Sequence, residues 1–131
     1  MKIMEKSNFF GFWAEHCGEG FPYFVDQPKN VLSESESILV AAYLENCPVW
    51  IASPGIVYSP LDGHIAGSMS VKTDGEWAWQ DTTAYYVREY RISPPLEFIR
   101  HIQSRSYIFP SEKEIDVAQL DFPASGITGT E

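Results

Sequence analysis

The sequence has little positive charge, few cysteines and no long apolar run. Nine Lys and Arg stand against eighteen Asp and Glu in 131 residues, and the net charge is −9. Such a chain would repel a nucleic acid rather than bind it through counterion release. The longest apolar run, Ile38 to Leu44, is far shorter than the roughly 20 residues that a membrane span needs. We therefore expect a protein that binds neither nucleic acid nor membrane.

The cysteine and histidine pattern argues against a disulfide, a metal site and a cofactor. Cys17 and Cys47 are the two thiols, and no apolar leader follows the charged N-terminus, so we expect a cytoplasmic protein with free, buried thiols. His16 and His64 complete a set of zinc-ligand residue types. These four residues lack the close Cys–Cys or His–His spacing that presents two ligands to one ion.

The organisation of the chain indicates one domain followed by a tail. With 44% apolar residues, positions 1–110 can bury a single core. Positions 111–131 hold one basic and five acidic residues, and Pro123, Gly126 and Gly129 break any periodicity. We expect this acidic C-terminal segment to be loosely attached.

Helix signals occur at three places. Ser33 and Glu36 form a capping-box pattern before the helically spaced apolar residues that end at Asn46. The first expected helix is 34–46. The second begins after an Asp81 N-cap and reaches Tyr90. The third begins after a Ser93 N-cap, has Pro94 in its first turn and reaches Ser104.

Strand signals surround a central β-hairpin in residues 68–79. A three-residue loop, Thr73–Gly75, would place the apolar side chains on one face. The expected pairs are Lys72 with Glu76, Val71 with Trp77 and Met69 with Trp79, and further strands are expected at 49–51, 56–58 and 107–109. The order of elements predicts a small α+β domain with a mostly antiparallel sheet and a central hairpin packed by about three helices.

No residue pattern in the chain is typical of a catalytic site. Glu15 and Glu19 would raise the pKa of the Cys17 thiol, and His101 is four residues after Glu97, which is explained by an ordinary helix-surface pair. Aromatic residues are dense before residue 25, so a small ligand-binding module or enzyme with a pocket near His16, Cys17 and His64 remains an alternative. A scaffold domain that uses its acidic tail is another.

The segment Lys72-Thr-Asp-Gly-Glu-Trp-Ala-Trp79, followed by Ala84-Tyr-Tyr-Val87, Tyr90 and the stretch from Pro95 to Ile102, carries a family resemblance. It resembles small bacterial proteins with a TDGxWxW and YYVxxY pattern, some of which are similar to immunity proteins of polymorphic-toxin systems. The resemblance implies a hairpin followed by two helices, and a protein that neutralises a cognate toxin by direct binding without catalysis.

The acidic charge agrees with such a role, because many antibacterial toxins are basic nucleases whose clefts face phosphates. The expected partner is thus a protein, most simply a toxin. Five carboxylates are the candidate toxin contacts: Glu34, Glu36, Asp74, Glu76 and Asp81.

Overall fold

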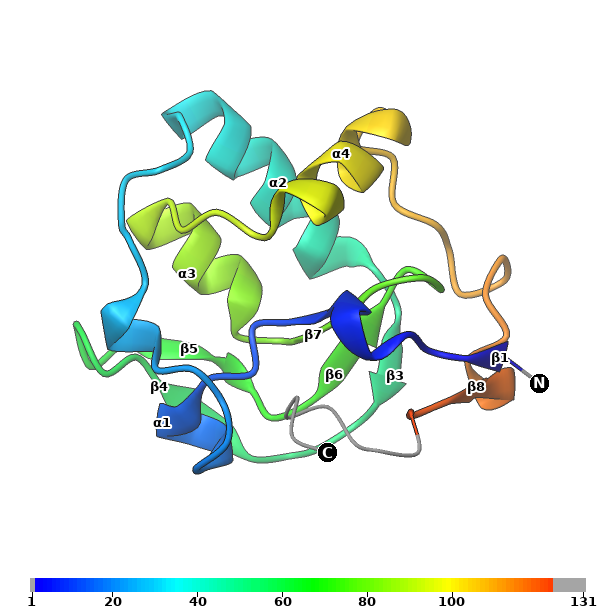
Figure 1. Ribbon diagram of the computed structural model, residues 1–131, viewed down its shortest axis with the longest axis horizontal. Coiled ribbons are helices and arrows are strands. Elements are labelled where there is room, and N and C mark those ends of the chain that lie inside the picture. The colour runs from blue at the N-terminus through cyan, green and yellow to red at the C-terminus, as the bar shows by residue number, and fades with distance from the viewer. Residues whose placement is uncertain (1, 124–131) are drawn as a thin grey trace.

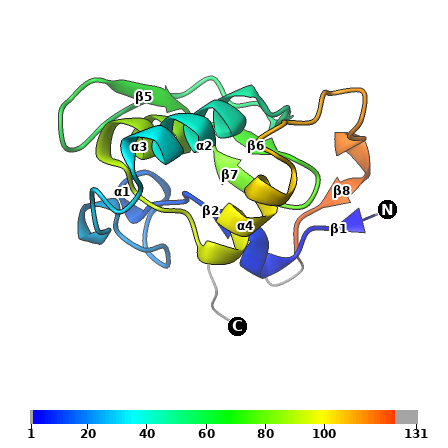
Figure 2. The same ribbon diagram turned by 90° about the horizontal axis from the view of Figure 1, so that it is seen from above.

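Helices cover one face of a central sheet, as the two views of the chain show (Figures 1 and 2). The computed structural model describes residues 2–123. The expected α+β class is confirmed. The three longer helices pack against one face of the sheet, where they contact Trp77 and Trp79 of the hairpin. The helices are α1 (Ala14–Cys17), α2 (Glu34–Asn46), α3 (Thr83–Tyr90) and α4 (Leu96–Ser104), with 3-10 turns at Lys6–Asn8, Phe24–Asp26 and Val117–Gln119.

The strands form one four-stranded sheet and two small pairs. The central sheet has the order β2 (Phe9–Phe10), β7 (Ala78–Gln80), β6 (Val71–Thr73) and β3 (Val49–Ile51). The pairs are β4 (Ile56–Tyr58) with β5 (Ile65–Ser68), and β1 (Lys2–Ile3) with β8 (Leu120–Asp121).

The prediction of a mostly antiparallel sheet is wrong. β2 runs parallel to β7, and β1 runs parallel to β8, whereas the other pairs are antiparallel. The N-terminal segment enters both parallel pairs, and its partners are remote in the chain. Alternation of apolar residues within short segments carries no information on such remote pairing.

The first long helix follows its sequence signals. α2 has the expected bounds, and the Ser33 hydroxyl accepts the N–H of Glu36 at 3.1 Å. The Glu36 carboxylate does not return to Ser33. It accepts the hydroxyl of Tyr107 instead, so only one half of the capping box forms.

The next two helices exist as expected, but their N-caps differ. α3 begins after Thr82, because the Asp81 carboxylate is occupied by the N–H and hydroxyl of Ser68. α4 begins after Pro95 rather than after Ser93. Pro94 disfavours a helical conformation at the residue before it, and Pro95 does the same for Pro94, so the helix starts later.

The hairpin register also differs from the prediction. Thr73 pairs with Ala78, Lys72 with Trp79 and Val71 with Gln80, so the loop comprises the four residues 74–77. The larger loop forms because the Asp74 carboxylate accepts the N–H groups of Glu76 and Trp77. Trp77 and Trp79 both pack into the helix-side core.

Both faces of the central sheet are covered. The core between sheet and helices includes Tyr43, Trp79 and Phe98, each fully buried. On the opposite face, Met4, Phe12 and Leu120 form a second core with the N- and C-terminal segments.

The segment after Pro110 packs on the body over part of its length, which differs from the expected loose attachment. Leu120 is buried, Ile115 and Val117 pack against the second core, and β8 pairs with β1. Residues 107–109 form no strand. The rest of the predicted tail, residues 124–131, lies outside the described residues. Within residues 2–123, no helix is long and apolar enough to cross a membrane.

Gly11 has both an unfavourable φ and a close neighbour. Its φ is +84°, and a Cβ at this position would lie 2.0 Å from Thr83 Oγ1. Gly63 has a similar φ of +76° but no heavy atom within 4 Å of the same position. An alanine at Gly63 would therefore meet backbone strain alone, whereas an alanine at Gly11 would meet both strain and steric overlap.

We predict that Gly11→Ala lowers the free energy of unfolding by about 2–4 kcal/mol, since it adds overlap with Thr83 to an unfavourable φ. The matched control Gly63→Ala should cost about 1 kcal/mol, from strain alone. Urea unfolding followed by tryptophan fluorescence measures both. Equal losses in the two variants would contradict the steric contribution.

Candidate functional site

The carboxylate of Asp74 organises a cluster of polar side chains. Asp74 begins the four-residue loop between β6 and β7, and its side chain is completely buried. Its Oδ1 accepts the N–H of Glu76 at 2.9 Å and the N–H of Trp77 at 2.8 Å. This is the usual role of an aspartate at the start of a turn.

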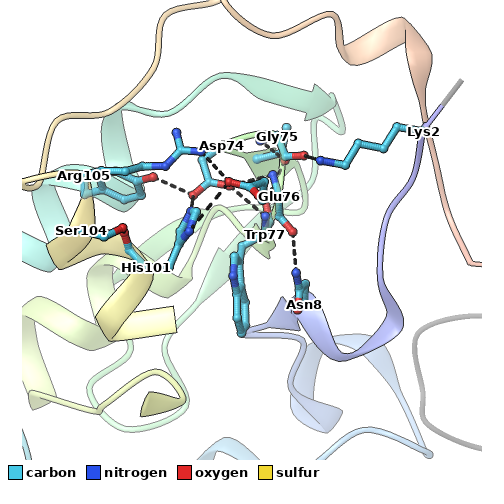
Figure 3. A network of polar contacts seen from close by, with 11 residues as sticks. Lys2, Asn8, Asp74, Gly75, Glu76, Trp77, His101, Ser104 and Arg105 are labelled. Carbon is cyan, nitrogen blue, oxygen red and sulfur yellow. Dashed lines mark hydrogen bonds and ion pairs between the residues drawn. The ribbon is translucent and has the colours of Figure 1, made fainter. Parts of the chain in front are cut away.

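The other carboxylate oxygen connects the loop to two helices. Oδ2 accepts the Tyr43 hydroxyl from α2 at 2.6 Å and lies 2.7 Å from His101 Nε2 on α4. Because a carboxylate only accepts hydrogen bonds, the proton of that contact lies on Nε2. Figure 3 shows His101 directed at Asp74 beside Trp77.

Charged side chains lie outside this buried centre (Figure 3). Glu76 Oε2 is 2.7 Å from Arg105 Nη2 and 3.9 Å from His101 Nδ1. The Lys2 ammonium donates to the carbonyl of Gly75 at 3.0 Å. Beside these groups lies a cavity of about 360 Å³, whose walls also include Glu114 and Asp116.

The bonding of Asp74 leaves little capacity for acid–base chemistry. Each oxygen accepts two hydrogen bonds, which fills the acceptor sites of a carboxylate. His101 has Nε2 on Asp74, and its Nδ1 lies 3.9 Å from the Glu76 carboxylate. The hydrogen bonds of Asp74 instead join the hairpin loop to α2 and α4.

The same burial keeps nearby groups in their neutral form. Burial, followed by the charge of Asp74, raises the pKa of Tyr43 far above its ordinary value, so its hydroxyl remains a donor. Burial and then Asp74 likewise raise the pKa of Cys47. A thiol with a raised pKa is a poor nucleophile, and Cys47 is a free, buried cysteine as expected.

The five predicted contact residues differ in exposure and in their partners. Glu34 is exposed in the first turn of α2, and Glu76 is exposed beside Arg105. Glu36 accepts the Tyr107 hydroxyl, and Asp81 accepts Ser68 and lies 3.4 Å from the Lys72 ammonium. Asp74 is buried, so its carboxylate is not on the surface that a partner would meet.

The residues of the alternative pocket each have a different environment. His16 Nε2 is 2.8 Å from the Tyr86 hydroxyl, and the Cys17 thiol donates to Gln80 at 3.3 Å. Burial raises the pKa of Cys17 and lowers that of His16. His64 is exposed between β4 and β5. The aromatic N-terminal stretch does line a cavity of about 320 Å³, which includes Phe9, Phe12 and Phe21.

A second polar cluster lies at the turn between β4 and β5. Asp62 accepts the Tyr85 hydroxyl at 2.7 Å, the Tyr90 hydroxyl and, at 2.8 Å, the N–H of His64. The Tyr90 bond contributes most to lowering the pKa of Asp62 to about 2, against an opposing effect of desolvation. The hydrogen bond to Asp62 in turn raises the pKa of Tyr85 to about 12.

Sequence reasoning missed the partners in both clusters. His101 contacts Asp74, and the explanation of a helix-surface pair with Glu97 is wrong. One signal was available, because His101 follows the core residue Phe98 by three positions and so lies beside the apolar stripe. No comparable local signal joins Asp62 to Tyr85 and Tyr90.

Comparisons with models of protein families, with curated proteins and with solved structures found no significant match to this chain. Within residues 2–123, no group of three or more His, Cys, Asp or Glu side chains could hold a metal ion. The functional interpretation therefore rests on the arrangement of this chain's own residues.

We predict that Asp74→Asn lowers the free energy of unfolding by about 2–4 kcal/mol. The amide replaces one buried acceptor by a donor that faces other donors, so a buried hydrogen bond is lost. The control Asp116→Asn, at an exposed position beside the same cavity, should change stability by less than about 0.5 kcal/mol. Thermal and urea unfolding measure both variants, and a loss below that of the control would refute the role given to Asp74.

We predict that Asp62→Asn shifts the ionisation of Tyr85 downward, toward the ordinary tyrosine pKa of about 10. In the native protein the folded state holds the Tyr85 proton more tightly than the unfolded chain. The stabilisation that the protonated Tyr85 gives to the fold is therefore complete below about pH 10. It is lost as the pH rises through about 12.

Tyrosine carbon NMR between pH 8 and 11.5 follows this ionisation. Tyr85 should stay protonated in the native protein and begin to ionise in the variant. Tyr43, whose pKa is raised first by burial, serves as the internal control and should not respond. A native Tyr85 that ionises near its ordinary pKa would show that the bond to Asp62 is not kept in solution.

Proposed function

We propose that this protein is a cytoplasmic, non-catalytic binding protein that neutralises a basic partner protein, in the manner of an immunity protein that blocks a bacterial toxin. The observation that carries the proposal is the distribution of charge. Most carboxylates are on the surface, whereas several of the few cations are engaged within the chain. Thirteen acidic residues are exposed: Glu5, Glu19, Asp26, Glu34, Glu45, Asp62, Glu76, Glu89, Glu97, Glu112, Glu114, Asp116 and Asp121.

The cations offset this negative surface only in part. Arg88 pairs with Glu45, Arg105 pairs with Glu76, and the Lys72 ammonium lies near Asp81. The net charge of −9 is therefore presented mainly by exposed carboxylates. Such a surface accelerates association with a basic protein and disfavours acidic competitors.

The Asp74 cluster supports a binding role rather than a catalytic one. Its carboxylate is saturated by donors from its own chain, and both nitrogens of His101 face carboxylates. A rigid connection between the hairpin and two helices instead keeps a binding surface in one conformation, which reduces the entropy lost on association.

We expect that co-expression with the protein encoded by the adjacent upstream gene restores growth that this partner alone inhibits. The two purified proteins should form a 1:1 complex, because a cognate inhibitor covers its target stoichiometrically. The association rate should fall by about tenfold or more between low and high salt, since the charges steer the encounter.

An unrelated acidic protein of similar size and charge is the control, and it should neither rescue growth nor form the complex. Neither rescue nor complex with the native chain would refute the proposal. The aromatic cavity beside Phe9 and Phe21 would then be tested for small-molecule binding.

A further inference from the structure

The outward face of the β4–β5 pair exposes an unusual amount of apolar surface for so small an element. Ile56, Tyr58 and Ile65 are 61%, 60% and 57% exposed, and Leu61 in the connecting turn is 40% exposed. Together with Asp62 and Tyr85 we call these residues the ribbon surface. A contiguous exposed apolar patch on a soluble protein is typical of an interaction site.

The strand register explains why these side chains remain exposed. Tyr58 pairs with Ile65, and Ile56 lies two residues before Tyr58, so the three side chains share one face of the ribbon. The alternate residues Val57 and Ala66 are buried, and Ala66 packs in the cluster of Tyr86. The inner face of the β4–β5 pair thus packs against the core, and the side chains on its outer face remain exposed.

Asp62 adds a fixed negative charge to this apolar face. Its Oδ2 accepts two tyrosine hydroxyls, and its Oδ1 accepts the N–H of His64. About one of its four acceptor sites remains free. The carboxylate is exposed and needs no reorganisation to receive a further donor.

The ribbon surface is also at a distinct place in the fold. Figures 1 and 2 both show β5 and the turn after β4 at the end of the molecule opposite β1 and β8. It lies beside α3, whose exposed Glu89 is close enough to influence the ionisation of Tyr85 and Tyr90. Arg88 lines a cavity with Ile65 and Tyr85, but it is paired with Glu45, so Asp62 and Glu89 leave a negative charge beside the apolar face.

We propose that the ribbon surface is the contact face for the basic partner protein. An arginine of the partner donates to the Asp62 carboxylate, and apolar residues of the partner cover Ile56, Tyr58 and Ile65. This inference rests on the proposed function and specifies its interface. Tyrosine is enriched at the energetic centre of protein interfaces. A planar guanidinium can donate to the carboxylate and stack on a neighbouring tyrosine ring at the same time.

Charge complementarity selects this occupant over a second copy of the chain. Two copies would bring together two molecules of net charge −9, with Asp62 and Glu89 of each at the contact. Like charges facing one another oppose such a pair, whereas a basic surface satisfies both the apolar and the acidic part of the ribbon.

The test uses the purified product of the adjacent upstream gene as the probe, and titration calorimetry as the measurement. Tyr58→Lys and Ile65→Lys each place a cation on the ribbon surface. Leu96→Lys and Ile108→Lys are matched controls, because these side chains are 59% and 71% exposed elsewhere and the charge change is the same. Asp62→Asn is compared with Glu97→Gln, an exposed acid on α4. Circular dichroism establishes that each variant is folded.

The two ribbon lysine variants should weaken binding by about 30-fold or more, and the controls by less than about threefold. If the native chain binds and the ribbon variants bind as tightly as the controls, the inference is overturned while the proposed function stands. If the native chain does not bind the probe, the proposed function fails and the interface fails with it. Self-association of the native chain in sedimentation velocity that Tyr58→Lys abolishes would assign the surface to a second copy and overturn the inference.

Discussion

The buried carboxylate of Asp74 is the interaction on which the arrangement of the other elements depends. Two of its hydrogen bonds set the hairpin loop, and the other two come from Tyr43 on α2 and His101 on α4. An unpaired charge at this depth would be costly, so the loop and both helices must be in place together. The loop conformation then places Trp77 against Phe98, with stacked rings 4.5 Å apart. One side chain thereby sets both the strand register and the packing of the helix layer.

The elements that sequence reasoning predicted well are those with local causes. α2 follows from Ser33 and the helical spacing of its apolar residues, and both determinants lie within a few residues of the helix they specify. The hairpin itself was also visible. Its register was not, because the Asp74 carboxylate closes a four-residue loop by accepting the N–H groups of Glu76 and Trp77, whereas the pattern of apolar residues favoured a shorter loop. The same limit applies to Asp81, whose carboxylate binds Ser68 instead of capping α3.

The candidate sites were harder to predict for the same reason. The local sequence does not tell whether a carboxylate is a surface charge or a buried hydrogen-bond acceptor. Asp74 and Glu34 differ mainly in the groups that the fold brings near them. Asp62 acquires its significance from Tyr85 and Tyr90, which come from another element. The net charge, in contrast, is fixed by composition, and the inference of a basic partner that rests on it needed no knowledge of the fold.

The pairing of β1 with β8 has a consequence for how the chain reaches its native state. Lys2 lies beside Leu120, so a strand at the start of the chain finds its partner near the end of the described segment. On a ribosome the helices can form early, whereas the N-terminal residues must wait until Leu120 has emerged. Contacts so distant in sequence slow folding, and in the interval apolar residues such as Met4 and Phe12 lack their native cover. The N-terminal segment is therefore the part of the nascent protein for which a chaperone would matter most.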